Sequence, residues 1–257
     1  MKDEEKILVV IPYLAEAAQG RELEFCLSGW RNHFKEDYLL VFVGENLPYI
    51  EGNDVFLVES ERVKPKKGMY RQHLDYVSCF RKVRKYFPRH KGFVFVADDC
   101  YAVNDFDLSD IKVLKQIADE FTGNPYMGGW QLDMARTREL LDREKLPSRN
   151  FTTHLPQWFE WDKLFALYDR YDMDNNSYVF ENLYYNYYYP TRIPFTIDED
   201  SDNFKCGVHR RTPTMVGNIK NAFSNKIWVQ NAEAGYTYEL EKMLTDYYGL
   251  TPRELRF

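Results

Sequence analysis

The sequence is poor in cysteine and has no paired cysteine motif. Its four cysteines, Cys26, Cys79, Cys100 and Cys206, lie far apart, and none forms a CxxC pair. Neither a disulfide framework nor a zinc-binding cysteine set is therefore indicated. The sequence also lacks any apolar run near the ~20 residues that a membrane-spanning helix requires, so no transmembrane segment is expected.

Positive charge and glycine-rich phosphate loops are lacking as well. The 34 Lys and Arg residues are outnumbered by 40 Asp and Glu, which gives a formal net charge of -6 and argues against nucleic acid as a partner. No GxGxxG or GxxxxGK[ST] motif occurs, so a nucleotide site would need other groups. The charged segment Met1–Lys6 leads directly into an apolar run and does not resemble a secretory signal, so a cytoplasmic location is the default expectation.

The most informative segment is a short apolar run that ends in two adjacent carboxylates. No polar residue falls between Phe93 and Ala97, which predicts a strand buried on both faces. Asp98 and Asp99 follow it, and burying them within the strand would be costly. We therefore expect them at its carboxyl end, where open α/β sheets bind ligands and where two carboxylates suit Mg²⁺ or Mn²⁺. The alternative is that they only cap the next turn.

Apolar runs and helical periodicity alternate through the first half of the chain. Strands are predicted at residues 7–13, 38–43, 55–58 and 92–97, and Pro12 is expected to end the first one. Helices are predicted at residues 20–34 and 69–87. This order predicts an α/β fold with a mostly parallel, Rossmann-like sheet flanked by helices.

The second half is rich in aromatic residues and less regular. Helices are expected from near Asp107, over 132–141, from Pro156, over 177–188 and over 232–248, while 193–211 reads as irregular or β-like. No repeat or flexible linker separates the two halves, so we expect one continuous domain.

Two segments of the second half carry candidate catalytic groups. His154 lies in a loop-like polar and aromatic segment, which favours a site role over a purely structural one. Glu181 lies among many aromatic rings, which predicts a raised pKa suited to a general base; an exposed helix carboxylate is the alternative. Asp162 is a further candidate base. Trp158 and Trp161, with the tyrosine-rich segment after Glu181, are candidates for stacking on sugar rings.

Cationic side chains provide candidate anion ligands. Arg71 is predicted in the first turn of a helix, a position that favours a cation only if an anion lies nearby. The cluster His209, Arg210 and Arg211 could clamp a diphosphate, and His209 could also be a metal ligand.

Two resemblances to known enzyme families follow from these segments. The strand at 7–13, together with the strand that ends in Asp98 and Asp99, resembles the GT-A-type glycosyltransferases, in which an N-terminal nucleotide-binding sheet ends in an acidic metal motif. More specifically, the run 98–106, then 154–156, then Glu181-Asn182 is similar to the ordered motifs of Stealth-type phosphosugar transferases of capsule polysaccharide synthesis. Pro12-Tyr13 departs from the strand end of that family, which favours ordinary glycosyl transfer.

The resemblance implies residues 1–107 as a nucleotide-sugar-binding half and 108–257 as an acceptor-binding half. It implies a glycosyltransferase that moves a sugar from a nucleotide-sugar donor to a carbohydrate or glycoconjugate acceptor, assisted by Mn²⁺ or Mg²⁺. The roles that it implies are a donor site at Pro12, Tyr13 and Glu16, a metal site at Asp98 and Asp99, and a base at Glu181, Asp162 or His154. A sugar-1-phosphate transferase and a noncatalytic carbohydrate-binding relative remain the alternatives.

Overall fold

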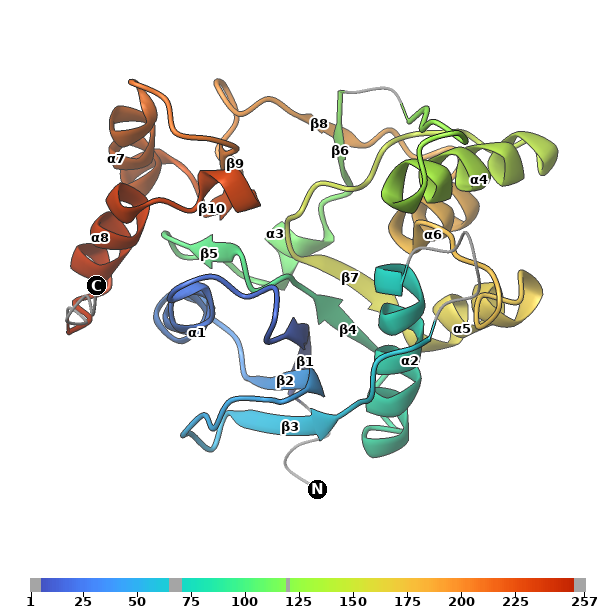
Figure 1. Ribbon diagram of the computed structural model, residues 1–257, viewed down its shortest axis with the longest axis horizontal. Helices are drawn as coiled ribbons and strands as arrows, with labels where there is room; N and C mark the ends of the chain where they lie inside the picture. The colour runs from blue at the N-terminus through green and yellow to red at the C-terminus, as the bar shows by residue number, and fades with distance from the viewer. Residues whose placement is uncertain (1–5, 65–70, 119–120, 252–257) are drawn as a thin grey trace.

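A five-stranded sheet forms the centre of the molecule. The computed structural model describes residues 6–64, 71–118 and 121–251. In these residues the central strands run in the order β3-β2-β1-β4-β7 (Figure 1). All neighbours in this sheet pair in parallel except β4 and β7, which are antiparallel. The predicted α/β fold with a mostly parallel sheet is therefore confirmed.

The elements have the following bounds. The strands of the central sheet are β1 (Ile7–Leu14), β2 (Tyr38–Glu45), β3 (Val55–Glu59), β4 (Gly92–Phe95) and β7 (Gln157–Glu160). Two smaller sheets contain β5 (Cys100–Ala102), β10 (Trp228–Asn231) and β9 (Lys205–Val208), and β6 (Lys115–Ile117) with β8 (Phe195–Ile197). The helices are α1 (Glu22–His33), α2 (Arg71–Tyr86), α3 (Leu108–Lys112), α4 (Gly129–Arg143), α5 (Trp161–Arg170), α6 (Phe180–Tyr188), α7 (Met215–Asn225) and α8 (Tyr238–Tyr247), with a 3₁₀ turn at Glu233–Gly235.

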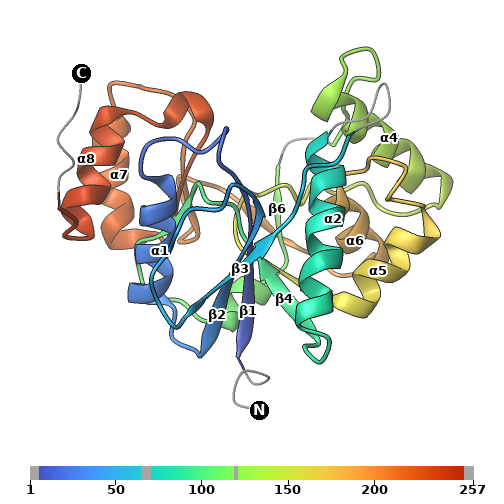
Figure 2. The same cartoon turned by 60° about the horizontal axis from the view of Figure 1, so that its bottom comes forward.

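The side chains of β1 point alternately into two separate cores. Val9 and Ile11 belong to the core that contains α1, α7 and α8, whereas Leu8 and Val10 belong to the core that contains α2, α4, α5 and α6. Figure 2 shows these two groups of helices on opposite sides of the sheet. The period of two along a strand explains this split, and it explains why the run is apolar without interruption.

Much of the aromatic content fills these cores. Phe80, Phe93, Phe159 and Phe180 are buried together on one face, and Trp30, Phe106 and Trp228 lie on the other. The tyrosine-rich segment forms α6, and its Tyr184 and Tyr185 are buried against β7. These two tyrosines therefore do not form an acceptor wall, because their rings are enclosed by protein.

Several predicted elements need correction. Pro12 does not end β1, since it pairs with Val43 inside the strand. The helix expected from Pro156 is preceded by β7, whose four residues pair antiparallel with β4, and starts only at Trp161. Strands β5, β6 and β10 and helix α7 were not predicted, and the single helix expected at 232–248 is a 3₁₀ turn followed by α8. Each missed strand is short, and its partner is distant in sequence.

The helix expected from near Asp107 is confirmed as α3. Asp107 caps α3, because its side chain accepts hydrogen bonds from the backbone N–H groups of Ser109 and Asp110. Within residues 6–64, 71–118 and 121–251, no helix combines the length and the apolar composition needed to cross a membrane.

Gly29 of α1 lies directly against β5, which leads to a stability prediction. A Cβ at Gly29 would lie 2.6 Å from the backbone nitrogen of Ala102. We expect Gly29→Ala to destabilise the fold by ~1–3 kcal/mol through this clash, although alanine is the better helix former. Gly217 in α7 is the matched control, because a Cβ there meets nothing within 4 Å.

For Gly217→Ala we expect no loss of stability and a gain of up to ~1 kcal/mol. Urea denaturation of both variants measures the difference. Equal effects at the two glycines would show that α1 does not press on β5 as described.

Candidate functional site

A large cavity opens at the carboxyl ends of the central strands. Its volume is about 1940 Å³, and its lining includes Tyr13 from the end of β1, Glu45 from the end of β2, and Asp98 and Asp99 after β4. The loop at residues 14–19 and the N-terminus of α2 also reach it. This position agrees with the ligand crevice expected for an open parallel sheet.

The two carboxylates after β4 are largely enclosed. Asp99 Oδ2 accepts a hydrogen bond from Gln230 Nε2 at 3.1 Å, and Oδ1 is buried without a hydrogen-bond partner. Burial, together with the negative charges of Asp99 and Glu22, raises the pKa of Asp98 to about 7. Burial also raises the pKa of Asp99 to about 6, although the hydrogen bond from Gln230 opposes the shift. A bound cation would therefore stabilise the charged form of both carboxylates.

Glu22 is a third carboxylate at this end of the cavity, and it was not among the residues predicted from the sequence. Its Oε1 accepts a hydrogen bond from Asn231 Nδ2 at 2.7 Å, and its Oε2 accepts one from the backbone N–H of Gln19 at 2.8 Å. Burial raises the pKa of Glu22 as well. The amides of β10 thus connect Glu22 and Asp99 and fix their orientation.

The carboxylates fit a metal ion only in part. A buried carboxylate oxygen without a partner, as at Asp99, is the kind of ligand that Mg²⁺ and Mn²⁺ prefer. Among the residues that the structure describes, however, no group of three or more His, Cys, Asp or Glu side chains is arranged to hold a metal. A cation at Asp98 and Asp99 would therefore need oxygens from a substrate or water to complete its coordination.

Glu181 lies at a second polar position in the cavity wall. It is only 9% exposed, and its Oε2 is buried without a hydrogen-bond partner. Burial raises its pKa to about 7, and the nearby His73 opposes the shift. His73 Nδ1 in turn lies 2.6 Å from Asp133 Oδ2, which also accepts a hydrogen bond from Ser177. The fixed imidazole limits how far the pKa of Glu181 can rise.

A third group of polar side chains gathers around β9. Lys205 is almost completely buried, with its Nζ 3.2 Å from the carbonyl oxygen of Thr153 and 3.4 Å from Glu199 Oε1. His154 lies nearby with a positive φ of 56°, a backbone conformation that costs energy in a non-glycine residue. Its enclosed position lowers its pKa, and the positive charges of Lys205 and His209 lower it further. His154 lines the cavity, and the lowered pKa keeps its imidazole neutral there.

The cavity brings together most of the predicted site residues. Its lining includes Pro12, Tyr13, Glu16, Arg71, Asp98, Asp99, His154, Glu181 and His209. The parallel sheet places Tyr13, Asp98 and Asp99 at one edge, whereas the loop before β7, helix α6 and the segment after β9 bring His154, Glu181 and His209 to the same cavity. Their roles remain predictions.

The other predicted site residues lie elsewhere. Trp161 is completely buried and stacks on Phe93 with ring centroids 4.0 Å apart, so a sugar cannot reach its ring. The Asp162 side chain is 95% exposed beside Arg84 and does not line the cavity. It is therefore not placed to act there as a base.

Trp158 and the two arginines are also outside the main cavity. Trp158 lines a separate cavity of about 340 Å³, where Lys112 Nζ lies 4.8 Å from its ring centroid. Arg211 is exposed and forms an ion pair with Glu239, and Arg210 is exposed next to it. The predicted diphosphate clamp is therefore reduced to His209, because the chain turns after this residue.

A local sequence pattern marks some of the cavity residues that were not predicted, and no such pattern marks the others. Gln230 and Asn231 end the apolar run 227–229, which is the same pattern that drew attention to Asp98 and Asp99. Lys205, Glu199 and His73 carry no such local signal, because only the packing of distant segments brings them to the cavity.

The fold of this chain is similar to that of a solved structure. The chain is similar to the apo structure of the bifunctional glycosyltransferase WbbM, with a TM-score of 0.54 and 14% identity over 96% of this chain and 50% of that one. It shares the fold of the matched part of that glycosyltransferase. At this low identity the similarity describes the fold alone, and the chain spans half the length of WbbM.

Further matches are weaker. One is a glycosyltransferase involved in glycosylation of the major capsid of PBCV-1, with a TM-score of 0.40 and 12% identity over 95% of this chain and 100% of that one. Another is the apo form of GlyE from Streptococcus pneumoniae TIGR4, with a TM-score of 0.41 and 10% identity over 96% and 61% of the two chains. Neither score is high enough to add to the fold assignment. No protein-family model matches the chain, and no curated protein shows significant sequence similarity to it.

Proposed function

We propose that this protein is a glycosyltransferase of the GT-A type, which moves a sugar from a nucleotide-sugar donor to a carbohydrate acceptor with the help of Mn²⁺ or Mg²⁺. The observation that carries the proposal is the pair of carboxylates at the carboxyl end of β4, enclosed in the cavity with Asp99 Oδ1 unpartnered. A bound divalent cation would neutralise charge on the diphosphate leaving group.

The residues around the carboxylates suit a nucleotide-sugar donor. Tyr13 and the loop at 14–19 line the cavity beside Asp98 and could contact the nucleoside. Arg71, at the first position of α2, adds a guanidinium on the cavity wall that could face a phosphate. Lys205 adds an ammonium group from β9, and His209 adds an imidazole directly after that strand.

Glu181 is the base that the proposal assigns. In the transfer step the bond between the anomeric carbon and the diphosphate oxygen breaks, and the acceptor oxygen forms the new bond to that carbon. The acceptor hydroxyl proton moves to the Glu181 carboxylate, whose pKa of about 7 suits this task near neutral pH. Its burial and its unpartnered Oε2 keep the carboxylate available for that proton.

A panel of nucleoside diphosphates, each with and without Mn²⁺, tests the proposal. We expect one nucleotide to raise the melting temperature only with the metal, by ~5–10 °C at about 100 times its dissociation constant. The matching nucleotide sugar should then release nucleoside diphosphate in the presence of an acceptor.

The other outcomes of this experiment discriminate the alternatives. Release of a nucleoside monophosphate would indicate sugar-phosphate transfer in place of glycosyl transfer. Binding of carbohydrate without any response to nucleotides would indicate a noncatalytic relative, and the proposed enzyme function would be abandoned.

A further inference from the structure

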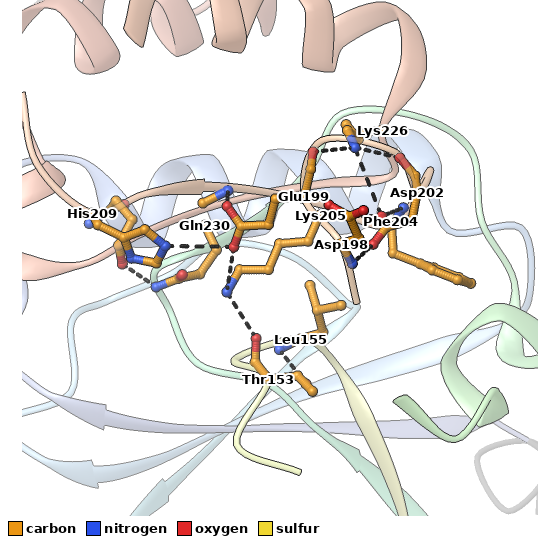
Figure 3. A network of polar contacts seen from close by, with 12 residues as sticks. Thr153, Leu155, Asp198, Glu199, Asp202, Phe204, Lys205, His209, Lys226 and Gln230 are labelled. Atoms are coloured by element: carbon orange, nitrogen blue, oxygen red, sulfur yellow. Dashed lines mark hydrogen bonds and ion pairs between the residues drawn. The ribbon is translucent and has the colours of Figure 1, made fainter. Parts of the chain in front are cut away.

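The carboxylate of Glu199 lies in a small set of anion-binding groups on β9. Its Oε2 accepts a hydrogen bond from the backbone N–H of Gly207 at 2.8 Å. Its Oε1 lies 3.4 Å from Lys205 Nζ and 3.6 Å from His209 Nε2. Figure 3 shows Lys205 and His209 pointing toward this carboxylate from two sides. A backbone N–H combined with two cationic or donor side chains is a combination that also binds phosphate oxygens.

Gly207 allows the Glu199 carboxylate to lie directly over β9. A Cβ at this position would lie 2.5 Å from both carboxylate oxygens of Glu199 and 2.6 Å from His209 Nε2. Any other residue would therefore push the carboxylate and the imidazole away from the backbone. Because Gly207 has no side chain, there is space for the Glu199 carboxylate beside the backbone.

The donors are fixed more firmly than the carboxylate that they hold. The Lys205 side chain is 5% exposed, and the carbonyl oxygen of Thr153 also accepts from its ammonium group. The Glu199 side chain is 34% exposed and comes from the acidic loop, residues 198–202. It can rotate toward solvent more easily than Lys205 can move.

The backbone of the acidic loop is anchored without the Glu199 side chain. Lys226 Nζ donates to the carbonyl oxygen of Glu199 at 2.6 Å and to that of Asp202 (Figure 3). Within the loop, Asp198 Oδ2 accepts a hydrogen bond from Ser201 at 2.6 Å. The Glu199 side chain could therefore leave its position while the loop keeps its backbone conformation.

The anion-binding groups face the main cavity. Glu199, Lys205 and His209 all line it, together with Asp99. The positive charge of Lys205 lies close enough to act electrostatically on Asp99. A phosphate group held by β9 would therefore lie in the same cavity as the paired carboxylates.

We propose that the Gly207 N–H, Lys205 and His209 form a phosphate-binding subsite, and that the Glu199 carboxylate holds this subsite until a phosphate group displaces it. The subsite itself follows from the contacts around Glu199. That its ligand is the diphosphate of a nucleotide-sugar donor rests on the proposed function.

Calorimetric titration with inorganic pyrophosphate, in the absence of metal and nucleoside, tests the subsite. Glu199→Gln keeps the size of the side chain and removes its charge, so the competing anion is weakened. We expect this variant to bind pyrophosphate about 3- to 10-fold more tightly than the unmodified protein. Lys205→Met should bind it ~10-fold more weakly, because the buried ammonium is lost.

Asp200→Asn is the matched control. Asp200 is an exposed carboxylate of the same acidic loop, so the variant makes the same change in net charge. Its pyrophosphate affinity should change by less than about 2-fold, since exposed charges are screened by salt. Melting curves of all three variants establish that they are folded.

Unchanged or weaker binding by Glu199→Gln would overturn the proposal, because Glu199 would then not compete with the anion. An equal gain in Asp200→Asn would also overturn it, since net charge alone would explain the effect. If Glu199→Gln binds pyrophosphate more tightly while no nucleotide sugar is ever consumed, the subsite stands and the proposed glycosyl transfer fails.

Discussion

Asp99→Asn is expected to reduce sugar transfer by ~10²–10³-fold and to abolish stabilisation by nucleotide and Mn²⁺. The carboxylate has an unpartnered, buried Oδ1 in the cavity, and an amide cannot supply the negative charge that a cation requires. Steady-state kinetics and melting temperatures with and without Mn²⁺ measure the two effects.

The same substitution is expected to stabilise the ligand-free fold at pH 8. Burial raises the pKa of Asp99 from 3.8 to about 6, so the folded protein binds this proton more tightly than the unfolded chain does. Stability should therefore decrease as pH rises from about 4 to about 6, and the charged group should remain unfavourable above that range. Removing the charge should return on the order of 1 kcal/mol at pH 8, and this gain should shrink toward pH 4.

Asp105→Asn is the control for Asp99→Asn. Asp105 lies in the same stretch of chain, but it is exposed and pairs with Lys35 and His33 outside the cavity. It should retain full activity and the response to Mn²⁺. A fully active Asp99→Asn enzyme that still responds to Mn²⁺ would remove the metal site from the proposed mechanism.

Glu181→Gln is expected to lower kcat by ~10²–10⁴-fold, with a smaller effect on donor binding. Glutamine has the same shape but cannot accept the acceptor proton. Because burial raises the pKa of Glu181 to about 7, the activity of the unmodified protein should increase as pH rises through 7. Asp98, with a pKa of about 7, also has to lose its proton to hold a cation, so both groups favour activity above neutral pH.

Stability should change in the opposite direction to activity. Glu181 is deprotonated with difficulty in the folded protein, so the fold loses stability as pH rises from about 4.5 to about 7. At pH 8 we expect Glu181→Gln to be more stable than the unmodified protein, by on the order of 2 kcal/mol. Thermal denaturation at pH 5 and pH 8 measures this difference.

Asp162→Asn is the control for Glu181→Gln, because Asp162 was the alternative base and its side chain lies exposed beside Arg84. It should have normal kcat and a normal pH profile. If Asp162→Asn loses activity and Glu181→Gln keeps it, the base is wrongly assigned.

The amino-acid sequence alone determines the part of the core that is built from uninterrupted apolar runs. The runs at β1, β2 and β4 can lie only in a sheet covered on both faces, and the carboxylates after β4 can lie only at its edge. The aromatic residues around Glu181 in the sequence predicted a carboxylate with a raised pKa, with an exposed helix carboxylate as the alternative. The structure buries Glu181.

Only the tertiary structure decided which of the other candidates meet in the cavity. Trp161 and Asp162 are adjacent in sequence, yet one is enclosed in a core and the other is in solvent, because successive side chains of helix α5 point about 100° apart. Lys205 and Glu199 reach the cavity because β9 pairs with β10, which in turn pairs with β5 directly after Asp99. β5 and β10 lie more than a hundred residues apart in the sequence, and no local pattern encodes their pairing.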